Sequence, residues 1–254
     1  VRVKRVHLEE DAGRLQHALD GSTLVDFNRA GVPLLELVTE PDIESAAQAV
    51  AFAKELQLIL KYLGVSDADM EKGQMRVEAN ISVRPEGTEK YGTKVEVKNL
   101  NSFKAVEGAI AYELKRQERL CAEEKMVAQE TRGWNDAKGV TESQRSKESA
   151  HDYRYFPEPD LPPLDLSAWD LEGMRRELPE LPAAKRERFA KQFGLTDEQI
   201  EWLVSDKSLA NYFEAAASEL KGLMPSARYQ ALANYFTSDL KGLMNEAGVL
   251  AAEL

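Results

Sequence analysis

The clearest pattern along the chain is an alternation of apolar and polar residues over positions 75–84. Apolar side chains occupy every second position there, and polar side chains stand between them. Such alternation is typical of a β-strand with one buried face. A turn-rich stretch over 85–92 follows, and a second alternating run covers 93–98. The pattern predicts a hairpin that has one apolar face and one polar face.

The polar face of this predicted hairpin has a mixed composition. It gathers cations, carboxylates, an amide and a hydroxyl, namely Arg76, Glu78, Asn80, Ser82, Arg84, Lys94, Glu96 and Lys98. One interpretation is a sheet with one side in water. The other is a ligand site, because carboxylates and amides beside cations are the groups that hold a metal ion and phosphate oxygens. The pattern alone gives the two interpretations about equal weight.

An earlier strand, predicted over residues 1–11, ends in three consecutive carboxylates, Glu9, Glu10 and Asp11. These groups repel one another unless a cation or basic groups lie nearby. An exposed acidic turn explains them equally well. Simple alternation places His7, Glu9 and Asp11 on one face and Glu10 on the other, whereas a β-bulge would reverse that order. The choice between Glu9 and Glu10 therefore stays open.

Further extended segments and helices follow from local signals. Residues 23–29 and 33–38 are predicted to be strands, and 126–145 a second hairpin. Ser45 and Gln48 form a capping-box pattern at the start of a helix that ends at Gly64. The sequence Asn-Leu-Asn-Ser over 99–102 caps another helix. From residue 165 onward only short helices are predicted, including 182–194 with its basic residues turned outward.

Four prolines within residues 157–163 mark a change from alternating to helical periodicity. A segment so rich in proline cannot be helical and is typical of a semi-rigid connector. We therefore expect two domains, 1–160 and 161–254. The fold class that the pattern predicts is α+β: an antiparallel-sheet domain with packed helices, followed by a small all-α helical domain.

Composition and charge exclude several classes of protein. The 254-residue chain has a formal net charge of −11, which argues against indiscriminate binding of nucleic acids while allowing a local basic patch. Its single cysteine excludes an internal disulfide and a cysteine-based zinc site. No apolar run is long enough to span a membrane and no signal peptide opens the chain, so we expect a cytoplasmic protein. The chain begins at Val1 in the middle of a strand pattern, which indicates a fragment.

Several segments together resemble one known family. They are HLEEDAGR, LVDFNRAGVPLLELVTEPD, VEANISVRP, GTKVEVKNLNSF and DYRYFPEPDLPPL. In this order and approximate spacing they are similar to the B subunit of the bacterial tRNA-dependent amidotransferases that convert Glu-tRNA(Gln) or Asp-tRNA(Asn) to the amide. The resemblance covers about the first two-thirds of the chain. The helical remainder is similar but less distinctive.

The resemblance implies a cradle domain that binds ATP and Mg²⁺, followed by a helical domain that leans on the tRNA. It also implies that the protein works as one subunit of a heterotrimeric ligase in protein biosynthesis. The expected partners are a glutamine amidase subunit, a small third subunit and misacylated tRNA, and no membrane is expected among them. Three departures from the family pattern stand out. The family's opening strand and its C-terminal tail domain are absent from this sequence, and Glu78 stands where many members have Asp.

In the family chemistry, ATP phosphorylates the side-chain carboxylate of the misacylated amino acid, and ammonia then displaces the phosphate. The sequence contains no GxxxxGK[ST] loop, so the polar face of the hairpin must hold the nucleotide. The residues expected to contribute fall into three groups: Glu10, Glu9 as its alternate, and Glu78 for Mg²⁺; Arg76, Arg84, Lys94 and Lys98 for phosphates; and Asn80 to orient a ligand. Glu10, Glu78 and Lys98 are the expected catalytic residues.

Two other functions remain as alternatives. In the first, the fragment is a non-catalytic scaffold that binds tRNA and the amidase subunit. In the second, Glu9 and Glu10 form a carboxylate hydrolase, which is disfavoured because adjacent strand residues point to opposite faces. Binding of ATP and Mg²⁺ by the chain separates the ligase from the scaffold. The sequence does not distinguish Glu-tRNA from Asp-tRNA as the substrate.

Overall fold

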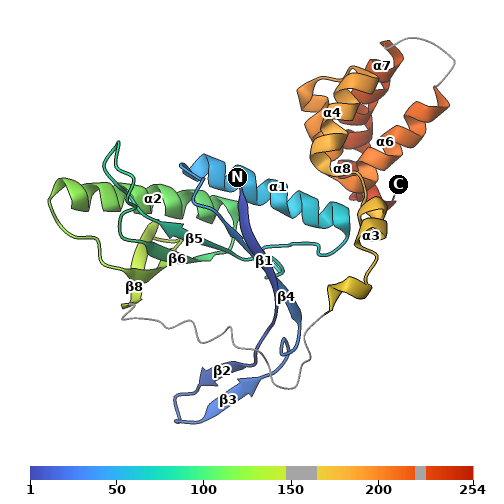
Figure 1. The fold of residues 1–254 in the computed structure, drawn as a ribbon. Coiled ribbons are helices and arrows are strands. Elements are labelled where there is room, and N and C mark those ends of the chain that lie inside the picture. Colours follow the sequence, from blue (N-terminus) through green and yellow to red (C-terminus); the bar gives the residue numbers. More distant parts are fainter. Residues whose placement is uncertain (147–164, 221–226, 254) are drawn as a thin grey trace. The chain divides into compact units, whose positions relative to one another are not determined.

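The computed structural model describes residues 1–146, 165–220 and 227–253 (Figure 1). The domain boundary predicted between residues 160 and 161 lies outside these described residues. By compactness the chain divides into two units, Val1–Phe52 and Ala53–Leu254. Each unit is described by itself below.

The first unit consists of two antiparallel two-stranded ribbons. In one ribbon β1 (Val3–Glu10) pairs with β4 (Pro33–Thr39), and in the other β2 (Arg14–His17) pairs with β3 (Thr23–Asp26). The register of the first ribbon places His7 opposite Glu36. The strands predicted from the pattern of this part of the chain are therefore confirmed.

Helix α1 (Ala46–Leu63) begins in the first unit and ends in the second. Its N-terminus is stabilised by Ser45 and Gln48, as the capping pattern predicts. The Gln48 backbone N–H donates to Ser45 Oγ at 3.2 Å, while Gln48 Oε1 accepts the N–H of Glu44 at 2.8 Å. Gly64 follows the last helical residue and has a φ of +70°. Glycine suits this position because it adopts the left-handed conformation without steric cost.

The main sheet of the second unit has four strands in the order β5-β6-β7-β8, which are Val77–Ile81, Val95–Leu100, Glu130–Asn135 and Val140–Ser146. The β5–β6 hairpin and the β7–β8 hairpin are antiparallel, which confirms both predicted hairpins. The two hairpins join through β6 and β7, which run parallel. Turn signals identify each hairpin, but they carry no information on how two hairpins meet, so the sequence did not predict this parallel pair.

Helix α2 (Phe103–Ala122) connects β6 to β7 and packs on one face of the sheet, where it contacts β5, β6 and β8 (Figure 1). The predicted cap is confirmed, since Ser102 Oγ accepts the backbone N–H of Ala105 at 3.0 Å. Val95 and Val97 of β6 are fully buried, as is Val106 of α2. The other face of the sheet, which carries the alternate residues of β5 and β6, is turned away from α2.

The C-terminal part of the chain is helical, as predicted. Its elements are η1 (Leu166–Ala168), α3 (Leu171–Glu177), α4 (Pro182–Phe193), α5 (Asp197–Val204), α6 (Lys207–Glu219), α7 (Ala227–Tyr235), η2 (Phe236–Leu240), α8 (Lys241–Ala247) and η3 (Ala251–Glu253). Its core is built on Phe189, Phe193 and Phe213, whose ring centroids lie 5.2 to 5.6 Å apart. Tyr62 of α1 is buried in the same core and donates a hydrogen bond to the Val204 carbonyl at 2.9 Å.

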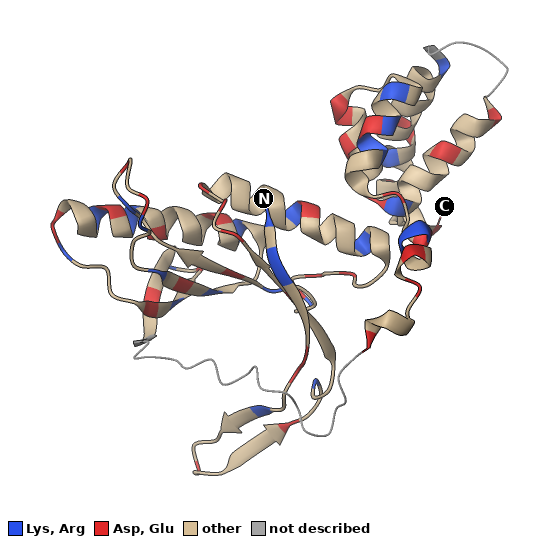
Figure 2. Cartoon of the chain, in the orientation of Figure 1, with Lys and Arg blue, Asp and Glu red and all other residues tan. Residues whose placement is uncertain are grey.

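The basic residues of α4 differ from their prediction. Lys185, expected on the outer face, is only 5% exposed, and its Nζ lies 2.6 Å from Glu214 Oε2. Arg188 pairs with Glu180 at 2.6 Å. Figure 2 shows the acidic and basic residues interspersed along these helices. The prediction that the basic residues of α4 turn outward is therefore wrong for Lys185, whereas Lys191, whose side chain is 81% exposed, lies outward as predicted. Among the described residues, no helix is both long and apolar enough to cross a membrane.

Candidate functional site

The face of the four-stranded sheet that is turned away from α2, called here the open face, carries the central residues of the predicted site. Lys98 of β6 lies between two carboxylates, with its Nζ 3.0 Å from Glu78 Oε1 and 3.8 Å from Glu96 Oε1. Thr131 of the parallel strand β7 donates from Oγ1 to Glu96 Oε2 at 2.8 Å. Glu78 and Lys98 come together because the β5–β6 register that pairs Ala79 with Val97 and Asn80 with Glu96 brings Glu78 opposite Lys98, next to the point where the register shifts.

Burial differs sharply among the charged members of the open face. The side chain of Glu78 is 47% exposed and that of Lys98 is 34% exposed, whereas Glu96 is only 14% exposed. An exposed ion pair contributes at most about 1 kcal/mol to stability. A ligand can therefore replace either partner of the Glu78–Lys98 pair at small cost. Glu96, which also accepts from Thr131, is more firmly placed.

Three other predicted residues are exposed and available to a ligand. The side chains of Arg76, Asn80 and Lys94 make no hydrogen bond or ion pair with another described residue. Asn80 lies opposite Glu96 in the β5–β6 register. The structure thus gathers Glu78, Asn80 and Lys98 on one face, as the alternation predicts.

Arg84 is placed differently from the other predicted phosphate ligands. Strand β5 ends at Ile81, so Arg84 belongs to the loop that follows. Its guanidinium lies over the Tyr91 ring, 4.6 Å from the ring centroid, and donates to the Glu89 carbonyl. A phosphate contact by Arg84 would require these local contacts to be given up or shared.

The first unit contains a separate group of possible metal ligands. One ligand atom from each of His7, Glu9 and Glu36 lies within 4.8 Å of the other two. His7 Nε2 lies 2.8 Å from Glu9 Oε1, and His7 is opposite Glu36 in the β1–β4 ribbon. Glu10 is exposed and lies on the opposite face of the ribbon. Of the two carboxylates that the sequence left open, Glu9 is the one grouped with other possible ligands.

A cation would compete with Arg5 for this group. Arg5 Nη2 donates to Glu36 Oε1 at 2.9 Å, and Arg5 Nε lies 3.4 Å from His7 Nδ1. Two carboxylates and one imidazole fit a divalent ion, although Mg²⁺ prefers oxygen ligands and keeps several waters. Glu36 is absent from the site residues that the sequence predicts. It is the one charged residue of the mostly apolar strand β4, and that isolation is the signal through which sequence reasoning could have found it.

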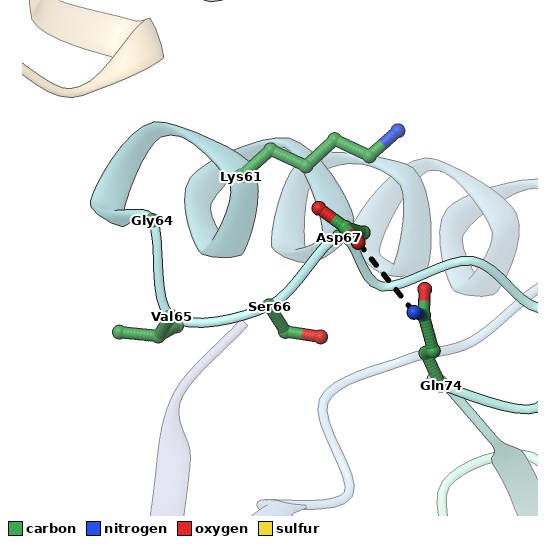
Figure 3. A pocket seen from close by; sticks show the side chains of 6 residues that line it. All are labelled: Lys61, Gly64, Val65, Ser66, Asp67 and Gln74. Carbon is green, nitrogen blue, oxygen red and sulfur yellow. Dashed lines mark hydrogen bonds between the residues drawn. The ribbon is translucent and has the colours of Figure 1, made fainter.

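Two shallow depressions lie elsewhere on the second unit. One follows the end of α1 and is lined by Lys61, Gly64, Val65, Ser66, Asp67 and Gln74 (Figure 3). It contains none of the residues predicted for the site. The other lies along the ends of β6, β7 and β8 and is lined by Asn99, Gly133, Trp134, Asn135, Asp136, Glu142, Ser143 and Gln144. It begins at the residue after Lys98.

Comparison with known protein families gives a match over residues 1–172 to the model described as GatB/GatE catalytic domain. A protein of Herpetosiphon aurantiacus, named as the B subunit of an aspartyl/glutamyl-tRNA(Asn/Gln) amidotransferase, is 48% identical over 254 residues, which is 100% of this chain and 52% of that protein. A protein of the same name from Synechococcus elongatus is 48% identical over 260 residues, covering 100% of this chain and 51% of its own length. The chain spans about half the length of these curated relatives.

Proposed function

This chain belongs to the GatB/GatE catalytic domain family, and from that premise we propose that it forms part of a carbon–nitrogen ligase that acts on misacylated tRNA. The reaction is ATP-dependent activation of the side-chain carboxylate of Glu-tRNA(Gln) or Asp-tRNA(Asn), followed by amidation. The nitrogen comes from glutamine. The name that the relatives share designates one subunit of an amidotransferase, which supports both the reaction and the presence of other subunits.

The proposed reaction has two steps. A carboxylate oxygen of the amino acid attacks the γ-phosphorus of ATP, the bond from that phosphorus to the bridging oxygen breaks, and ADP leaves. Ammonia then attacks the carbonyl carbon of the acyl phosphate, phosphate leaves with the electrons of the broken C–O bond, and the nitrogen loses a proton. Such chemistry requires from the protein mainly positioning and neutralisation of negative charge.

The observation that supports this function best is the arrangement on the open face. Lys98 stands between two carboxylates in an exposed pair that a phosphate can displace, and Asn80 stands on the same face. We assign Lys98, Lys94, Arg76 and Arg84 to the phosphates. Asn80 would orient the ligand by hydrogen bonds, and Glu78, released from Lys98, would bind the metal.

Mg²⁺ would neutralise phosphate charge and align the reacting oxygens. We propose Glu78 as the metal ligand of the open face and, as a separate assignment in the first unit, Glu9 or Glu10. The grouping of Glu9 with His7 and Glu36 favours Glu9 over Glu10. The family supports the use of ATP, and the carboxylate set supports the metal.

The partners follow from the same chemistry. Ammonia must be released from glutamine by a separate amidase, and we propose an amidase subunit together with a small third subunit. The misacylated tRNA presents the carboxylate. These partners are proposed for the full-length protein of which this chain corresponds to about half.

The test is a pair of substitutions in the full-length protein, assembled with its partners. Glu78→Gln is expected to weaken Mg²⁺-dependent ATP binding and to abolish acyl-phosphate formation. Lys98→Ala should weaken nucleotide binding but leave subunit association unchanged. Glu89→Gln, in the loop after β5, is the matched control, because it removes an exposed charge away from the open face. Equal ATP affinity and turnover in Glu78→Gln and Glu89→Gln would favour the scaffold function instead.

A further inference from the structure

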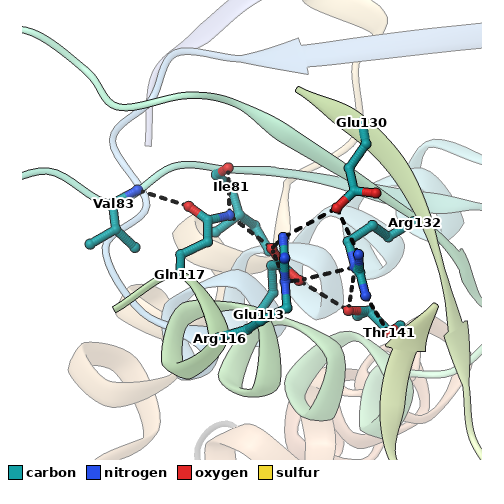
Figure 4. A network of polar contacts seen from close by, with 8 residues as sticks. All are labelled: Ile81, Val83, Glu113, Arg116, Gln117, Glu130, Arg132 and Thr141. Atoms are coloured by element: carbon teal, nitrogen blue, oxygen red, sulfur yellow. Dashed lines mark hydrogen bonds and ion pairs between the residues drawn. The ribbon is translucent and has the colours of Figure 1, made fainter. Parts of the chain in front are cut away.

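The α2 side of the four-stranded sheet contains a polar cluster that the proposed reaction does not use (Figure 4). Its centre is formed by Glu113 and Gln117 of α2, and both side chains are 0% exposed. Burial of two polar side chains is costly unless every donor and acceptor finds a partner. Their partners therefore indicate what the cluster holds in place.

Gln117 holds the backbone at the end of β5. Its Nε2 donates to the Ile81 carbonyl at 3.2 Å, and its Oε1 accepts the backbone N–H of Val83 at 3.1 Å. The side-chain amide thereby binds backbone groups that a neighbouring strand would otherwise bind, at the point where β5 leaves the sheet. The loop over residues 82–92 starts from this anchored position.

Glu113 fixes the orientation of that amide. Its Oε1 accepts from Gln117 Nε2 at 2.9 Å, so the nitrogen of Gln117 faces Ile81 and the oxygen faces Val83. Glu113 is held in turn by Arg116, whose Nη2 lies 2.7 Å from Oε1, and by Thr141 Oγ1 at 3.0 Å from Oε2. Neither side chain has freedom to rotate without breaking several hydrogen bonds.

The cluster also connects the two hairpins. Arg132 of β7 lies 3.7 Å from Glu113 Oε2 and 2.7 Å from Glu130 Oε1, and it donates to the Thr141 carbonyl of β8 at 2.6 Å. Burial alone would raise the pKa of Glu130, but hydrogen bonds from Ser143 and Arg132 hold that pKa below its ordinary value. The end of β5 is thus tied through α2 to β7 and β8.

The position of β5 matters because, among the described residues, β5 is the outermost strand of the sheet and pairs with β6 alone. Its register with β6 shifts between Val77 and Ala79, beside Glu78. Such an irregularity locally disrupts the hydrogen bonds between two strands, so an attachment from elsewhere adds to what β6 supplies. Gln117 supplies that attachment at Ile81, one residue after Asn80.

From this geometry we propose that Gln117 is a positioning residue for the open face. By fixing the end of β5 from behind the sheet, it sets the positions of Glu78 and Asn80 relative to Lys98. The inference rests on the proposed function, since it concerns the same ligand site. It differs from a purely structural role, which would lower stability without changing Mg·ATP binding by the folded protein.

The test compares two glutamines that each hold a backbone carbonyl. Gln117→Leu keeps a similar volume and removes both contacts to β5. Gln57→Leu is the matched control, because Gln57 Nε2 donates to the Ala68 carbonyl at 2.7 Å, near the end of α1 and away from the open face. Both variants are made in the full-length protein and studied at a temperature where circular dichroism shows them folded.

We expect Gln117→Leu to weaken Mg·ATP binding roughly tenfold or more, as is typical when a residue supporting metal ligands is removed. Gln57→Leu should bind as wild type does, even where its thermal stability is lowered by as much. Hydrogen exchange at the Val83 amide should be faster in Gln117→Leu and unchanged in Gln57→Leu. Gln117→Met, which keeps the length of the side chain and removes both contacts to β5 without adding a charge beside Glu113, should give a similar loss and replaces Gln117→Leu if that variant does not fold.

The inference and the proposed function fail in different ways. If wild type binds Mg·ATP, Glu78→Gln does not, and the Gln117 variants bind as tightly as Gln57→Leu, the positioning role is overturned while the proposed function stands. If wild type itself shows no Mg²⁺-dependent ATP binding, the proposed function fails and this inference fails with it.

Discussion

The two faces of the four-stranded sheet carry the same kinds of side chain in opposite states. On the α2 side, Glu113 is 0% exposed, while Arg116 and Arg132 are 12% and 13% exposed, and each is paired. On the open face, the side chain of Glu78 is 47% exposed and that of Lys98 is 34% exposed, and their main contact is with each other. Carboxylates and cations are present on both faces, so residue type does not distinguish them.

The two faces differ in which groups satisfy the hydrogen bonds of their polar side chains, protein groups or water. A buried donor or acceptor that lacks a partner costs roughly 1–3 kcal/mol, so folding selects an arrangement in which the α2 side is saturated with protein partners. Polar groups on the open face can use water instead, and they keep hydrogen-bonding capacity for a ligand. A saturated cluster therefore indicates a structural role, and an exposed, sparsely paired cluster of the same chemistry indicates a binding role.

The sharpest test of this difference is Glu113→Ala. The substitution removes the shared acceptor of Arg116, Gln117 and Thr141, and it leaves Glu130 as the one carboxylate for the two largely buried cations Arg116 and Arg132 among the described residues. Breaking a buried charge pair on one side typically costs about 3–5 kcal/mol. Denaturant unfolding followed by circular dichroism should show a loss of this size. Glu118→Gln, on the exposed side of the same helix, should change the free energy of unfolding by less than about 0.5 kcal/mol. Similar losses in the two variants would contradict the distinction between the faces.

The second prediction concerns pH. The pKa of Glu130 in the folded protein is below its ordinary value of 4.5, because hydrogen bonds from Ser143 and Arg132 outweigh the effect of burial. Folding therefore favours the ionised carboxylate. This contribution to stability is fully present above pH 4.5 and is lost as pH falls through the lower folded-state pKa.

The measurement is the free energy of unfolding between about pH 7 and pH 3, for wild type and for Glu130→Gln. The difference between the two proteins should shrink on acidification, because wild type loses the contribution that the variant never has. The expected loss at neutral pH is smaller than that of Glu113→Ala, since Glu130 retains some contact with water. A constant difference across this pH range would show that Glu130 ionisation does not stabilise the fold.

The open face could largely be predicted from the sequence because strand alternation is local. Glu78 and Asn80 alternate with Val77, Ala79 and Ile81, and that spacing alone assigns their faces. The caps at Ser45 and Ser102 were likewise predicted from a few neighbouring residues and are confirmed. Each of these features depends on residues that are close together in the chain.

The α2 side could not be predicted, because its partners are distant in sequence. Helical periodicity alone places Arg116 with Lys115 and Arg119 on the solvated side of α2, yet its side chain turns inward toward Glu113 and the distant Glu130. The parallel pairing of β6 with β7 brings Glu130 and Arg132 to this position, and no local signal encodes that pairing. The burial of Lys185 was not predicted for the same reason, since its partner Glu214 lies on another helix.

The group formed by His7, Glu9 and Glu36 depends on a pairing as well as on alternation. Alternation predicts the shared face of His7 and Glu9, but the nearness of Glu36 follows from the β1–β4 register. Arg84 shows that alternation can also extend beyond the strand it predicts. The alternating pattern extends to residue 84, but the strand ends at Ile81, and the remaining residues follow the loop.

A third prediction tests the exposed ion pair itself. Lys98→Ala removes the cation between Glu78 and Glu96, and the two carboxylates are then left without it. Because both Glu78 and Lys98 are exposed and Glu96 keeps its hydrogen bond from Thr131, the free energy of unfolding should fall by no more than about 1 kcal/mol. Added salt should reduce even this loss. A loss comparable to that of Glu113→Ala would mean that the open face is also structural.

The smallest effect is expected at Asn80, the amide of the open face. Its side chain is exposed and makes no hydrogen bond with another described residue, so Asn80→Ala should change the free energy of unfolding by less than about 0.5 kcal/mol. Thr141→Val is the matched comparison on the α2 side. It removes a hydroxyl of a residue only 3% exposed, one that donates to Glu113 and accepts from Arg132, and it should cost about 1–3 kcal/mol. The two variants are compared by denaturant unfolding under identical conditions. If Asn80→Ala proves as costly as Thr141→Val, Asn80 is held by the fold and is not free to orient a ligand. If Asn80→Ala leaves stability unchanged but weakens Mg·ATP binding, the amide serves the ligand.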